Sequence, residues 1–447
     1  MDKIAIIGAG LVGSLQAIYM ARKGFQVSVY ERRPDIRAAE LVAGRSINLA
    51  LSDRGWKALK GAGIHEEIEK IAIPMRGRMV HSVEGEQSFQ PYGFEEQAIY
   101  SVSRGELNKQ LLIKADEHPN VELFFNHKVR DLDLKTNELQ LEHVTSKQRT
   151  QKAYDRILGT DGAFSAIRQR LMKTDRFNFS QTYLGHGYKE LRIPANADGT
   201  HKIDKHSLHI WPRGQYMLIG LPNLDGSFTL TLFFPYDGEV SFNALDTDEK
   251  VMAFFNETFA DAVALIPDLL KDYNENPTAS LVTVRCNPWH YQDKVCLMGD
   301  ASHAIVPFYG QGMNSGFEDC TVFNNFFEQD DWEWGEVFSQ FSEKRVSEAN
   351  AISELALRNY VEMRDLTANE QWLLQKKIER KITTKHPDKW LPLYSQVTFS
   401  HTPYDVALAN GELQDAIMKR VMDRPDIADV WDSEEVENAV LEELGKV

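Results

Sequence analysis

Residues 4–13 read Ile-Ala-Ile-Ile-Gly-Ala-Gly-Leu-Val-Gly. The four apolar residues at the start predict a strand that is covered on both faces. The glycines have the GxGxxG spacing: Gly8 suits a tight turn, Gly10 lets a phosphate approach the backbone, and Gly13 lets a helix pack on the strand. The stretch therefore predicts a strand, a turn and a helix whose N-terminus binds a dinucleotide.

The residues that follow support this interpretation. A helix is expected over 15–22, and the alternating residues 26–30 predict a second strand that ends at Glu31. Glu31 follows Gly13 at close to the spacing, about 20 residues, at which the motif places a ribose-binding acid. The alternative is an ordinary glycine-rich turn with a solvated glutamate. The strand, glycines, helix, second strand and acid in this order favour the nucleotide site.

Composition narrows the class of protein. The 447 residues are too many for one core, so two or three domains are expected. The net charge of −16 argues against binding to nucleic acid or to an anionic membrane. No apolar run is long enough for a membrane helix, and a strand begins too early for a signal peptide. Cys286, Cys296 and Cys320 lack metal-site spacing and predict reduced, buried thiols, so we expect a cytoplasmic protein without metal.

Two further motifs follow later in the chain. Asp161-Gly162 comes after an apolar strand, and Gly299-Asp300 comes after the apolar residues 295–298. Each dipeptide alone is more often a turn than a site. Asp300 could accept a hydrogen bond from a ribose or ribitol hydroxyl, and the amides of Gly310 to Asn314 could form an anion-binding nest at a helix start.

The three motifs in this order resemble the single-component flavin-dependent aromatic hydroxylases. The resemblance implies an α/β fold with a Rossmann-like FAD-binding domain, an antiparallel β-sheet substrate domain and a helical C-terminal region. We expect the FAD-binding domain to comprise residues 1–72, 98–180 and 282–330. The substrate domain would then comprise 73–97 and 181–281, followed by the helical region over 331–447.

The same resemblance implies the cofactors and their contacts. It predicts non-covalent FAD, with NADPH as a co-substrate that needs no second Rossmann domain, and the segment at Asp161 resembles a motif linked to both. The residues implied in cofactor binding are Gly8, Gly10, Val12, Gly13, Glu31, Arg33, Ala50, Arg104, Val129, Asp161, Ala166, Asp300, Gly312, Met313 and Asn314.

Other segments resemble one branch of this family, whose members hydroxylate L-kynurenine at ring position 3 with NADPH and O2. These segments are residues 44–51, 75–81, 91–93, 186–191, 208–212, 359–364, 392–394 and 397–400. The branch uses a flavin C4a-hydroperoxide and acts in tryptophan degradation. Eukaryotic members carry a C-terminal membrane anchor, whereas this chain ends in acidic sequence, so we expect a soluble, bacterial-type form. The resemblance covers residues 1 to about 400.

Recognition of the substrate carboxylate requires an arginine fork. By resemblance, the substrate-binding residues are Arg78, Tyr92, Asn359, Tyr394, Phe233 and Phe308. Arg76 is a rival to Arg78, because it lies two residues away on the same face of the predicted strand. Glu362 and His303 are candidates for proton handling, although a structural role is favoured for each. From the residues alone, a surface position for the arginine and core packing for the aromatic residues would be the ordinary interpretation.

Three alternatives stay open. The chain could hydroxylate a different aromatic acid, it could be a flavin halogenase, or it could be a non-catalytic flavin-binding module. Trp332-Glu333-Trp334 resembles part of the halogenase motif, but no Ile-Pro follows it. The sequence leaves open whether the protein is a monomer or a homodimer, and the acidic tail after Asp423 is expected to be loosely ordered.

Overall fold

The structure is a computed structural model, and it describes residues 2–38, 48–93, 97–366 and 369–445. Its central feature is a six-stranded sheet in which β1 pairs in parallel with β12 on one side and β2 on the other. In sheet order the strands are β18 (His290–Tyr291), β19 (Val295–Leu297), β12 (Arg156–Gly159), β1 (Lys3–Ile7), β2 (Gln26–Tyr30) and β8 (Val121–Phe124). The predicted glycine turn leads from β1 into α1 (Leu11–Arg22), as the motif requires.

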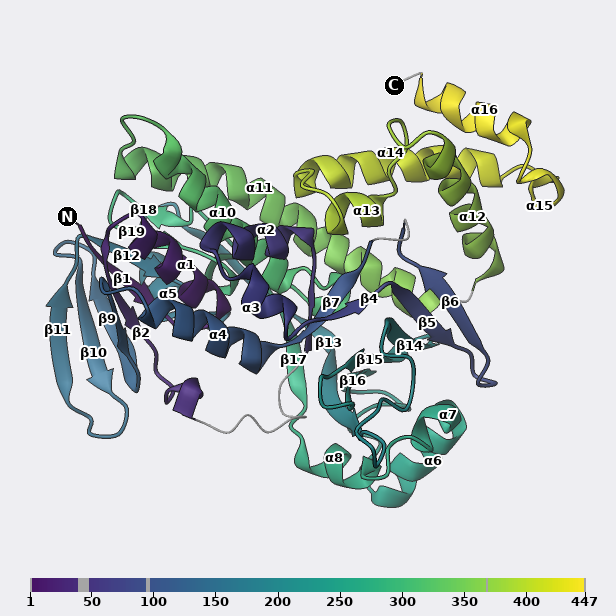
Figure 1. Ribbon diagram of the computed structural model, residues 1–447, viewed down its shortest axis with the longest axis horizontal. Helices are drawn as coiled ribbons and strands as arrows, with labels where there is room; N and C mark the ends of the chain where they lie inside the picture. The colour runs from purple at the N-terminus through teal and green to yellow at the C-terminus, as the bar shows by residue number, and fades with distance from the viewer. Residues whose placement is uncertain (1, 39–47, 94–96, 367–368, 446–447) are drawn as a thin grey trace.

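Helices and two small sheets complete this domain (Figure 1). One sheet has the order β3 (Asn48–Leu51), β7 (Ile99–Ser103) and β4 (Ile73–Met75). The other lies at the left edge of Figure 1 and contains β9 (His127–Asp133), β10 (Glu138–His143) and β11 (Arg149–Ala153). The helices are α2 (Asp53–Ala62), α3 (His65–Glu69), α4 (Arg104–Asp116), α5 (Ala166–Leu171), α9 (Asp300–His303) and α10 (Gly312–Asn325).

The second domain is built on a seven-stranded sheet. Its order is β17 (Ala279–Asn287), β13 (Asn178–Ile193), β16 (Phe228–Pro235), β15 (Tyr216–Pro222), β14 (Ser207–Arg213), β5 (Gly77–His81) and β6 (Gln87–Pro91). All neighbours are antiparallel except β14 and β5, which run parallel. The expected antiparallel sheet is therefore confirmed except at one pair.

Three of the expected domain boundaries do not match the sheets. The boundary between residues 180 and 181 falls inside β13, whose first residues pair with β17. The boundary between residues 281 and 282 falls inside β17, which pairs with β13 and so belongs wholly to the second domain. The boundary at residue 73 assigns β4 to the second domain, but β4 pairs with β7 of the first. The sequence of residues 250–266 predicts one helix, but in the structure this stretch is broken at Phe259, between α6 (Asp248–Thr258) and α7 (Ala260–Val263). With α8 (Leu269–Glu275), these helices pack on the seven-stranded sheet around buried aromatic residues.

The C-terminal region is helical, as expected. It contains α11 (Trp334–Val361), a short π-helix (Glu362–Leu366), α12 (Glu370–Lys385), α13 (Leu393–Thr398), α14 (Tyr404–Met422), α15 (Ile427–Val430) and α16 (Glu434–Leu444). In Figure 1, α11 runs across the molecule, and α12 to α16 form a separate lobe at the upper right. Among the described residues, no helix is both long enough and apolar enough to cross a membrane.

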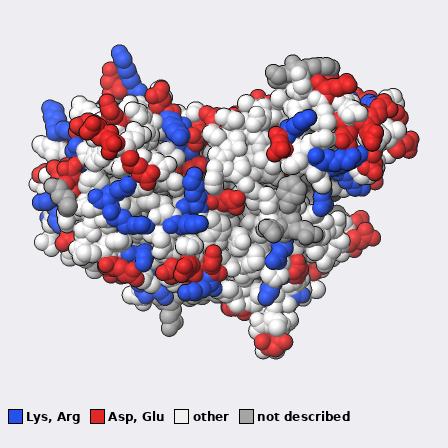
Figure 2. Space-filling model, turned by 45° about the horizontal axis from the view of Figure 1, so that its top comes forward, with Lys and Arg blue, Asp and Glu red and all other residues white. Residues whose placement is uncertain are grey.

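The expectation of a loosely ordered acidic tail was wrong. Val436 and Val440 of α16 are buried in a cluster with Ile417 and Met418 of α14. Their spacing of four residues gives α16 one apolar stripe, which packs on its neighbour while the acidic residues stay in solvent. Figure 2 shows these acidic side chains gathered over the C-terminal lobe. The three cysteines are buried and free, as predicted.

Candidate functional site

The three sequence motifs meet at the N-terminus of α1. A Cβ atom added to Gly8 would lie 2.7 Å from the carbonyl oxygen of Thr160, next to Asp161. A Cβ atom on Gly299 would lie 2.9 Å from a methyl carbon of Val12 in α1. Segments that are far apart in the sequence thus pack closely against the glycine turn and the start of α1.

The glycine turn fits a dinucleotide phosphate. Gly10 is the N-cap of α1, and a Cβ added there would meet no described atom within 4 Å. A Cβ on Gly13 would lie 1.9 Å from the Gly8 carbonyl oxygen, so this glycine is required for packing. Neither α1 nor α10 has an acidic residue in its first turn or a capping side chain among the described residues. Both helix starts therefore offer unpaired amides to an anion.

Glu31 is a buried hydrogen-bond acceptor beside this turn. Its side chain accepts a hydrogen bond from the Ala9 amide at 3.0 Å and from the amide and Nε of Arg33, each at 2.9 Å. Burial alone would raise the pKa of Glu31, but the bonds from Arg33 outweigh it and the pKa is lowered. The His127 amide donates to the Glu31 carbonyl oxygen, which places the β9 strand that carries Val129 alongside. A charged carboxylate here suits a ribose hydroxyl.

The two aspartates of the later motifs have different surroundings. Asp161 accepts hydrogen bonds from the amides of Ala166 and Ile167 at 2.6 and 3.4 Å, so it caps α5. The Asp300 side chain is accessible, yet surrounding protein atoms desolvate the carboxyl group and raise its pKa, against the charge of Arg104. Asp300 with Arg104 is therefore the better candidate for direct contact with a cofactor.

The glycine-rich segment before α10 is fixed to β3. The Asn314 side-chain amide donates to the carbonyl oxygens of Ala50 and Gly310, each at 2.8 Å, and its Oδ1 accepts from the Ser52 amide at 2.9 Å. Met313 is buried beside it. These bonds hold the segment that begins α10 at Gly312, and the set of residues as a whole fits FAD.

The predicted carboxylate ligand lies in a second, buried position. Arg78 of β5 is 7% exposed, and its guanidinium carbon lies 4.9 Å from the ring centre of Tyr394 and 5.6 Å from that of Tyr92. Within the described residues, Nε of Arg78 and the hydroxyl of Tyr92 have no hydrogen-bond partner. Buried donors of this kind are costly unless they are satisfied, so the arrangement favours a bound anion.

Glu362 supplies the opposite charge. Its carboxylate lies 3.9 Å from Nη1 of Arg78. Burial would lower the pKa of Arg78, but Tyr394, Tyr92 and Glu362 outweigh this effect and the pKa is raised. The site therefore contains a permanent positive charge next to a carboxylate.

Three tyrosines enclose this charge pair. Tyr394 stacks on Tyr92, with ring centres 5.2 Å apart, and on Tyr309, with ring centres 5.5 Å apart. Burial raises the pKa of each of these three phenols, so they remain neutral at physiological pH. We call Tyr92, Tyr309 and Tyr394 the aromatic box. Tyr309 lies in a short turn (Pro307–Tyr309) that leads into the glycine-rich segment, so one member of the box is adjacent in the sequence to the candidate cofactor site.

Burial favours Arg78 over Arg76, which lies just before β5. Arg76 is exposed, whereas Arg78 is buried. The ring-lining candidates are also together: Phe308 lies 4.9 Å from Phe233 and 4.0 Å from Tyr360, measured between ring centres. Asn359 donates from Nδ2 to the Phe308 carbonyl oxygen at 2.7 Å, which gives Asn359 a role in holding this turn.

His303 is buried and lies in a network of structural contacts. It is 4% exposed, its Nε2 lies 2.6 Å from Oδ2 of Asp319, and its ring stacks on Trp289. The same Asp319 oxygen accepts from the Gly299 amide at 2.8 Å, and its other oxygen accepts from Arg345 at 2.8 Å. These contacts are consistent with the structural role favoured for His303 from the sequence, which stays a prediction.

Sequence reasoning missed Asp319, and it missed the contact of Tyr309 with the substrate-site tyrosines. Asp319 fixes the turn that precedes Asp300, and Tyr309 completes the aromatic box. Asp319 lies in α10, the helix that begins in the glycine-rich segment. Nothing in the sequence distinguishes it from a solvent-exposed acid. Residues 44–47 of the segment compared above lie outside the described residues.

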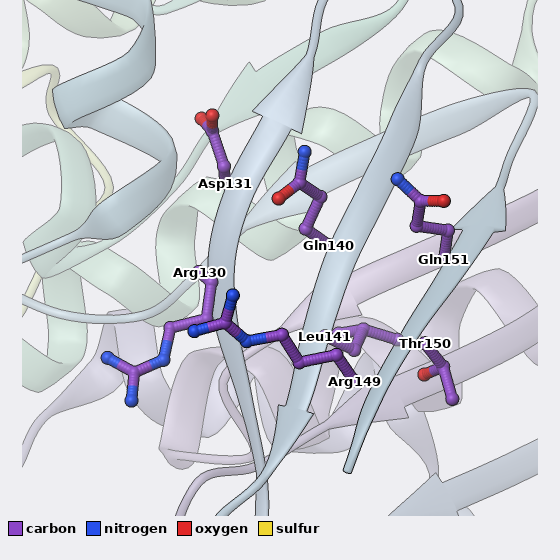
Figure 3. A pocket seen from close by; sticks show the side chains of 7 residues that line it. All are labelled: Arg130, Asp131, Gln140, Leu141, Arg149, Thr150 and Gln151. Atoms are coloured by element: carbon purple, nitrogen blue, oxygen red, sulfur yellow. The ribbon is translucent and has the colours of Figure 1, made fainter. Parts of the chain in front are cut away.

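Two depressions in the described surface contain no residue of the three motifs. One, of about 400 Å³, lies on the β9–β11 sheet, where Figure 3 shows Arg130 and Arg149 at its rim. Both arginines are paired with Glu142 of the same sheet. The other, of about 720 Å³, lies on the outer side of α2 around Trp56 and Tyr100. We assign neither a part in the chemistry.

The fold and the glycine-turn site define a class of protein. Residues 1–325 match the family model described as FAD binding domain, so the protein is a FAD-binding flavoprotein. Among solved structures, a tetrameric form of 2-methyl-3-hydroxypyridine-5-carboxylic acid oxygenase aligns with a TM-score of 0.66 at 16% identity, covering 82% of this chain and 94% of that one. A tetracycline destructase aligns with a TM-score of 0.60 at 21% identity, covering 88% and 99%. Both similarities concern the fold.

Full-length relatives identify the branch. The kynurenine 3-monooxygenase of Flavobacterium psychrophilum is 52% identical over 443 residues, which are 99% of this chain and 98% of the relative. That of Dictyostelium discoideum is 46% identical over 433 residues, 93% of each chain. The chain belongs to the kynurenine 3-monooxygenase family of FAD-dependent monooxygenases.

Proposed function

We propose that this protein hydroxylates L-kynurenine at ring position 3 to give 3-hydroxykynurenine, with NADPH and O2 as co-substrates. The observation that carries the proposal is the buried Arg78, which has an unpaired donor and lies against the stacked rings of Tyr92 and Tyr394. This position lies within a chain that belongs to a family named for this reaction. No feature of the described residues specifically favours another hydroxylase, a halogenase or a binding module.

The charges at the site match an amino acid. Kynurenine carries a carboxylate and an ammonium group on the same α-carbon, and the site presents a guanidinium and a carboxylate 3.9 Å apart. In this proposal Arg78 and Tyr92 donate to the substrate carboxylate, and Glu362 accepts from the ammonium group. Glu362 therefore has a binding role in this proposal and not a role in proton transfer.

The other end of the substrate is an aniline. Its nitrogen donates electron density to the ortho carbon, which is position 3, so the substrate itself supplies the activation. FAD, held by the glycine turn, Glu31, Asp300 and Arg104, supplies the oxygen-activating chemistry when bound. The task of the chain is then to fix the ring beside Phe308 and Phe233 and to exclude water.

Two finer points belong to the proposal. The segment at Asp161 and Gly162 is proposed to contact NADPH, because Gly162 has a φ of +81° and a Cβ there would meet no described atom within 4 Å. The three free, buried cysteines support a reducing compartment, and we propose the cytoplasm. The oligomeric state, monomer or homodimer, has no bearing on the site as proposed.

The test is direct. The purified, FAD-loaded protein should oxidise NADPH faster when kynurenine is added, and mass spectrometry should find kynurenine that has gained one oxygen atom. A stronger response to salicylate or a phenol would favour another hydroxylase. No stimulation by any aromatic acid would favour a binding module.

A further inference from the structure

Arg54 is a buried arginine that the proposed chemistry does not use. It is the second residue of α2, its side chain is 1% exposed, and all three of its guanidinium nitrogens have partners. Taking a guanidinium out of water costs free energy that its partners must compensate, so a buried ion pair is weak evidence for stability. The segments that Arg54 joins indicate what it does instead.

Its partners lie in both halves of the molecule. Nη1 pairs with Glu318 of α10, Nε donates to the Val397 carbonyl oxygen of α13 at 3.2 Å, and Nη2 donates to the carbonyl oxygen of Thr402, before α14. The guanidinium carbon also lies 4.0 Å from the ring centre of Tyr404, within the range of a cation–π contact. One side chain thus ties two helices of the cofactor-binding domain to two C-terminal helices.

The connection continues to the candidate cofactor site. The Tyr404 hydroxyl donates to Oε1 of Gln311 at 3.1 Å, and Nε2 of Gln311 lies 3.5 Å from Oγ of Ser52. Gln311 is 1% exposed and immediately precedes α10 in the glycine-rich segment. The C-terminal helices are therefore fixed to the same segment that is proposed to bind FAD.

The helix that Arg54 holds carries the aromatic side of the substrate site. Residues Leu393–Thr398 of α13 include Tyr394, whose ring covers Arg78, and Val397, whose carbonyl Arg54 binds. A helix of six residues is not stable on its own, so tertiary contacts determine its position. Movement of the Val397 end would carry Tyr394 with it, because the two residues are less than one turn apart.

We propose that Arg54 is a positioning residue for substrate binding. It holds α13 and the turn before α14 on the cofactor-binding domain, and through Tyr394 it sets the shape of the pocket around Arg78. Arg54 touches neither cofactor nor substrate in this account. The inference rests on the proposed function, because kynurenine is the ligand whose affinity it controls.

Arg54→Lys tests the proposal, since lysine keeps the charge for Glu318 but cannot reach two separate carbonyl oxygens at once. Kynurenine binding to the FAD-loaded protein is followed by the change in flavin absorbance, and FAD affinity is measured in parallel. We expect the kynurenine Kd to rise about tenfold and the FAD Kd to stay within about twofold. Lys57→Met, at an exposed position of the same helix, is the matched control and should change neither.

A double-mutant cycle separates positioning from a general structural role. In a Tyr394→Ala background, Arg54→Lys should change the kynurenine Kd by less than about threefold, because the residue it acts through is gone. An equal effect in both backgrounds, or no effect in either, overturns the proposal. An equal loss of FAD and kynurenine affinity also overturns it.

A milder variant covers the case in which Arg54→Lys does not fold. Tyr404→Phe keeps the ring under the guanidinium and removes only the hydroxyl bond to Gln311. It should raise the kynurenine Kd about threefold with unchanged FAD affinity, and an unchanged kynurenine Kd would count against the connection. Failure of the proposed function looks different, because the unsubstituted protein would then bind no kynurenine in the same assay.

Discussion

The guanidinium carbon of Arg78 lies 4.9 Å from the ring centre of Tyr394, although the two residues come from a strand near the N-terminus and a helix near the C-terminus. The proposed substrate site is therefore complete only when the C-terminal helices are in place. The contact also shows why the site could not be assembled from any one segment of the sequence.

Removal of the Arg78 charge should impair substrate binding and spare the cofactor. Arg78→Met should raise the kynurenine KM at least about 30-fold, about 2 kcal/mol, because the substrate carboxylate would be buried without a partner. Arg76→Met is the control, since Arg76 lies just before the same strand and is exposed. Near-normal kynurenine affinity in Arg78→Met, with FAD retained, would refute the carboxylate assignment.

Glu31 should matter for FAD retention. Glu31→Gln keeps the shape of the side chain but removes the charge that accepts from Ala9 and Arg33. We expect the FAD Kd to rise about tenfold or more, as for loss of a hydrogen bond to a charged group. Equilibrium titration of the apoprotein measures it, with Glu122→Gln on the exposed side of β8 as the control. An unchanged Kd would move ribose recognition to another residue.

A buried histidine chain predicts how stability depends on pH. Nε2 of His81 lies 2.9 Å from Nδ1 of His209, and Nδ1 of His81 lies 2.8 Å from the Asp261 carboxylate. Burial lowers the pKa of His209 from 6.5 to about 4. The unfolded chain therefore binds the proton more readily between these values, and the stability present above pH 6.5 is lost as the pH falls towards 4.

The expected size of this effect can be measured. Between pH 7 and 4.5, His209 should account for about 2 kcal/mol of lost unfolding free energy. Denaturant unfolding should be measured for the wild type and for His209→Asn, which cannot titrate. Between pH 7 and 4.5 the wild type should lose about 2 kcal/mol more unfolding free energy than the variant. Parallel pH profiles for the two proteins would mean that His209 is not held neutral in the fold.

The acidic tail should contribute to stability. Val440→Ala should lower the unfolding free energy of the C-terminal lobe by about 2 kcal/mol, since two buried methyl groups are lost. Val406→Ala, at an exposed position of α14, is the control. Hydrogen exchange of α16 reports the change locally. Exchange as fast as in an unfolded peptide, even in the unsubstituted chain, would restore the expectation of a loosely ordered tail.

The parts of the fold that follow from local pattern could be predicted from the sequence. Gly8, Gly10, Gly13 and Glu31 stand at fixed spacings that the phosphate turn requires, and each has the expected surroundings. β11 was missed because all five of its residues are exposed and four of them are polar, which leaves no alternating pattern. The break at Phe259 was missed because the apolar periodicity continues through it.

The proposed substrate site could not be predicted from the spacing of residues in the sequence. Arg76 and Arg78 are equivalent in the sequence, and only the packing of Tyr92 and Tyr394 around one of them decides between the two. Asp319 and Arg54 bind backbone groups of remote segments, and nothing adjacent to either residue indicates such a partner. Long-range contacts of this kind became visible only in three dimensions.

The most direct test of the central claim is the origin of the oxygen atom in the product. The FAD-loaded protein, supplied with kynurenine, NADPH and isotopically labelled dioxygen, should yield 3-hydroxykynurenine that carries one labelled oxygen atom on the ring. FAD-loaded protein that binds kynurenine but yields no labelled ring-hydroxylated product would contradict the account.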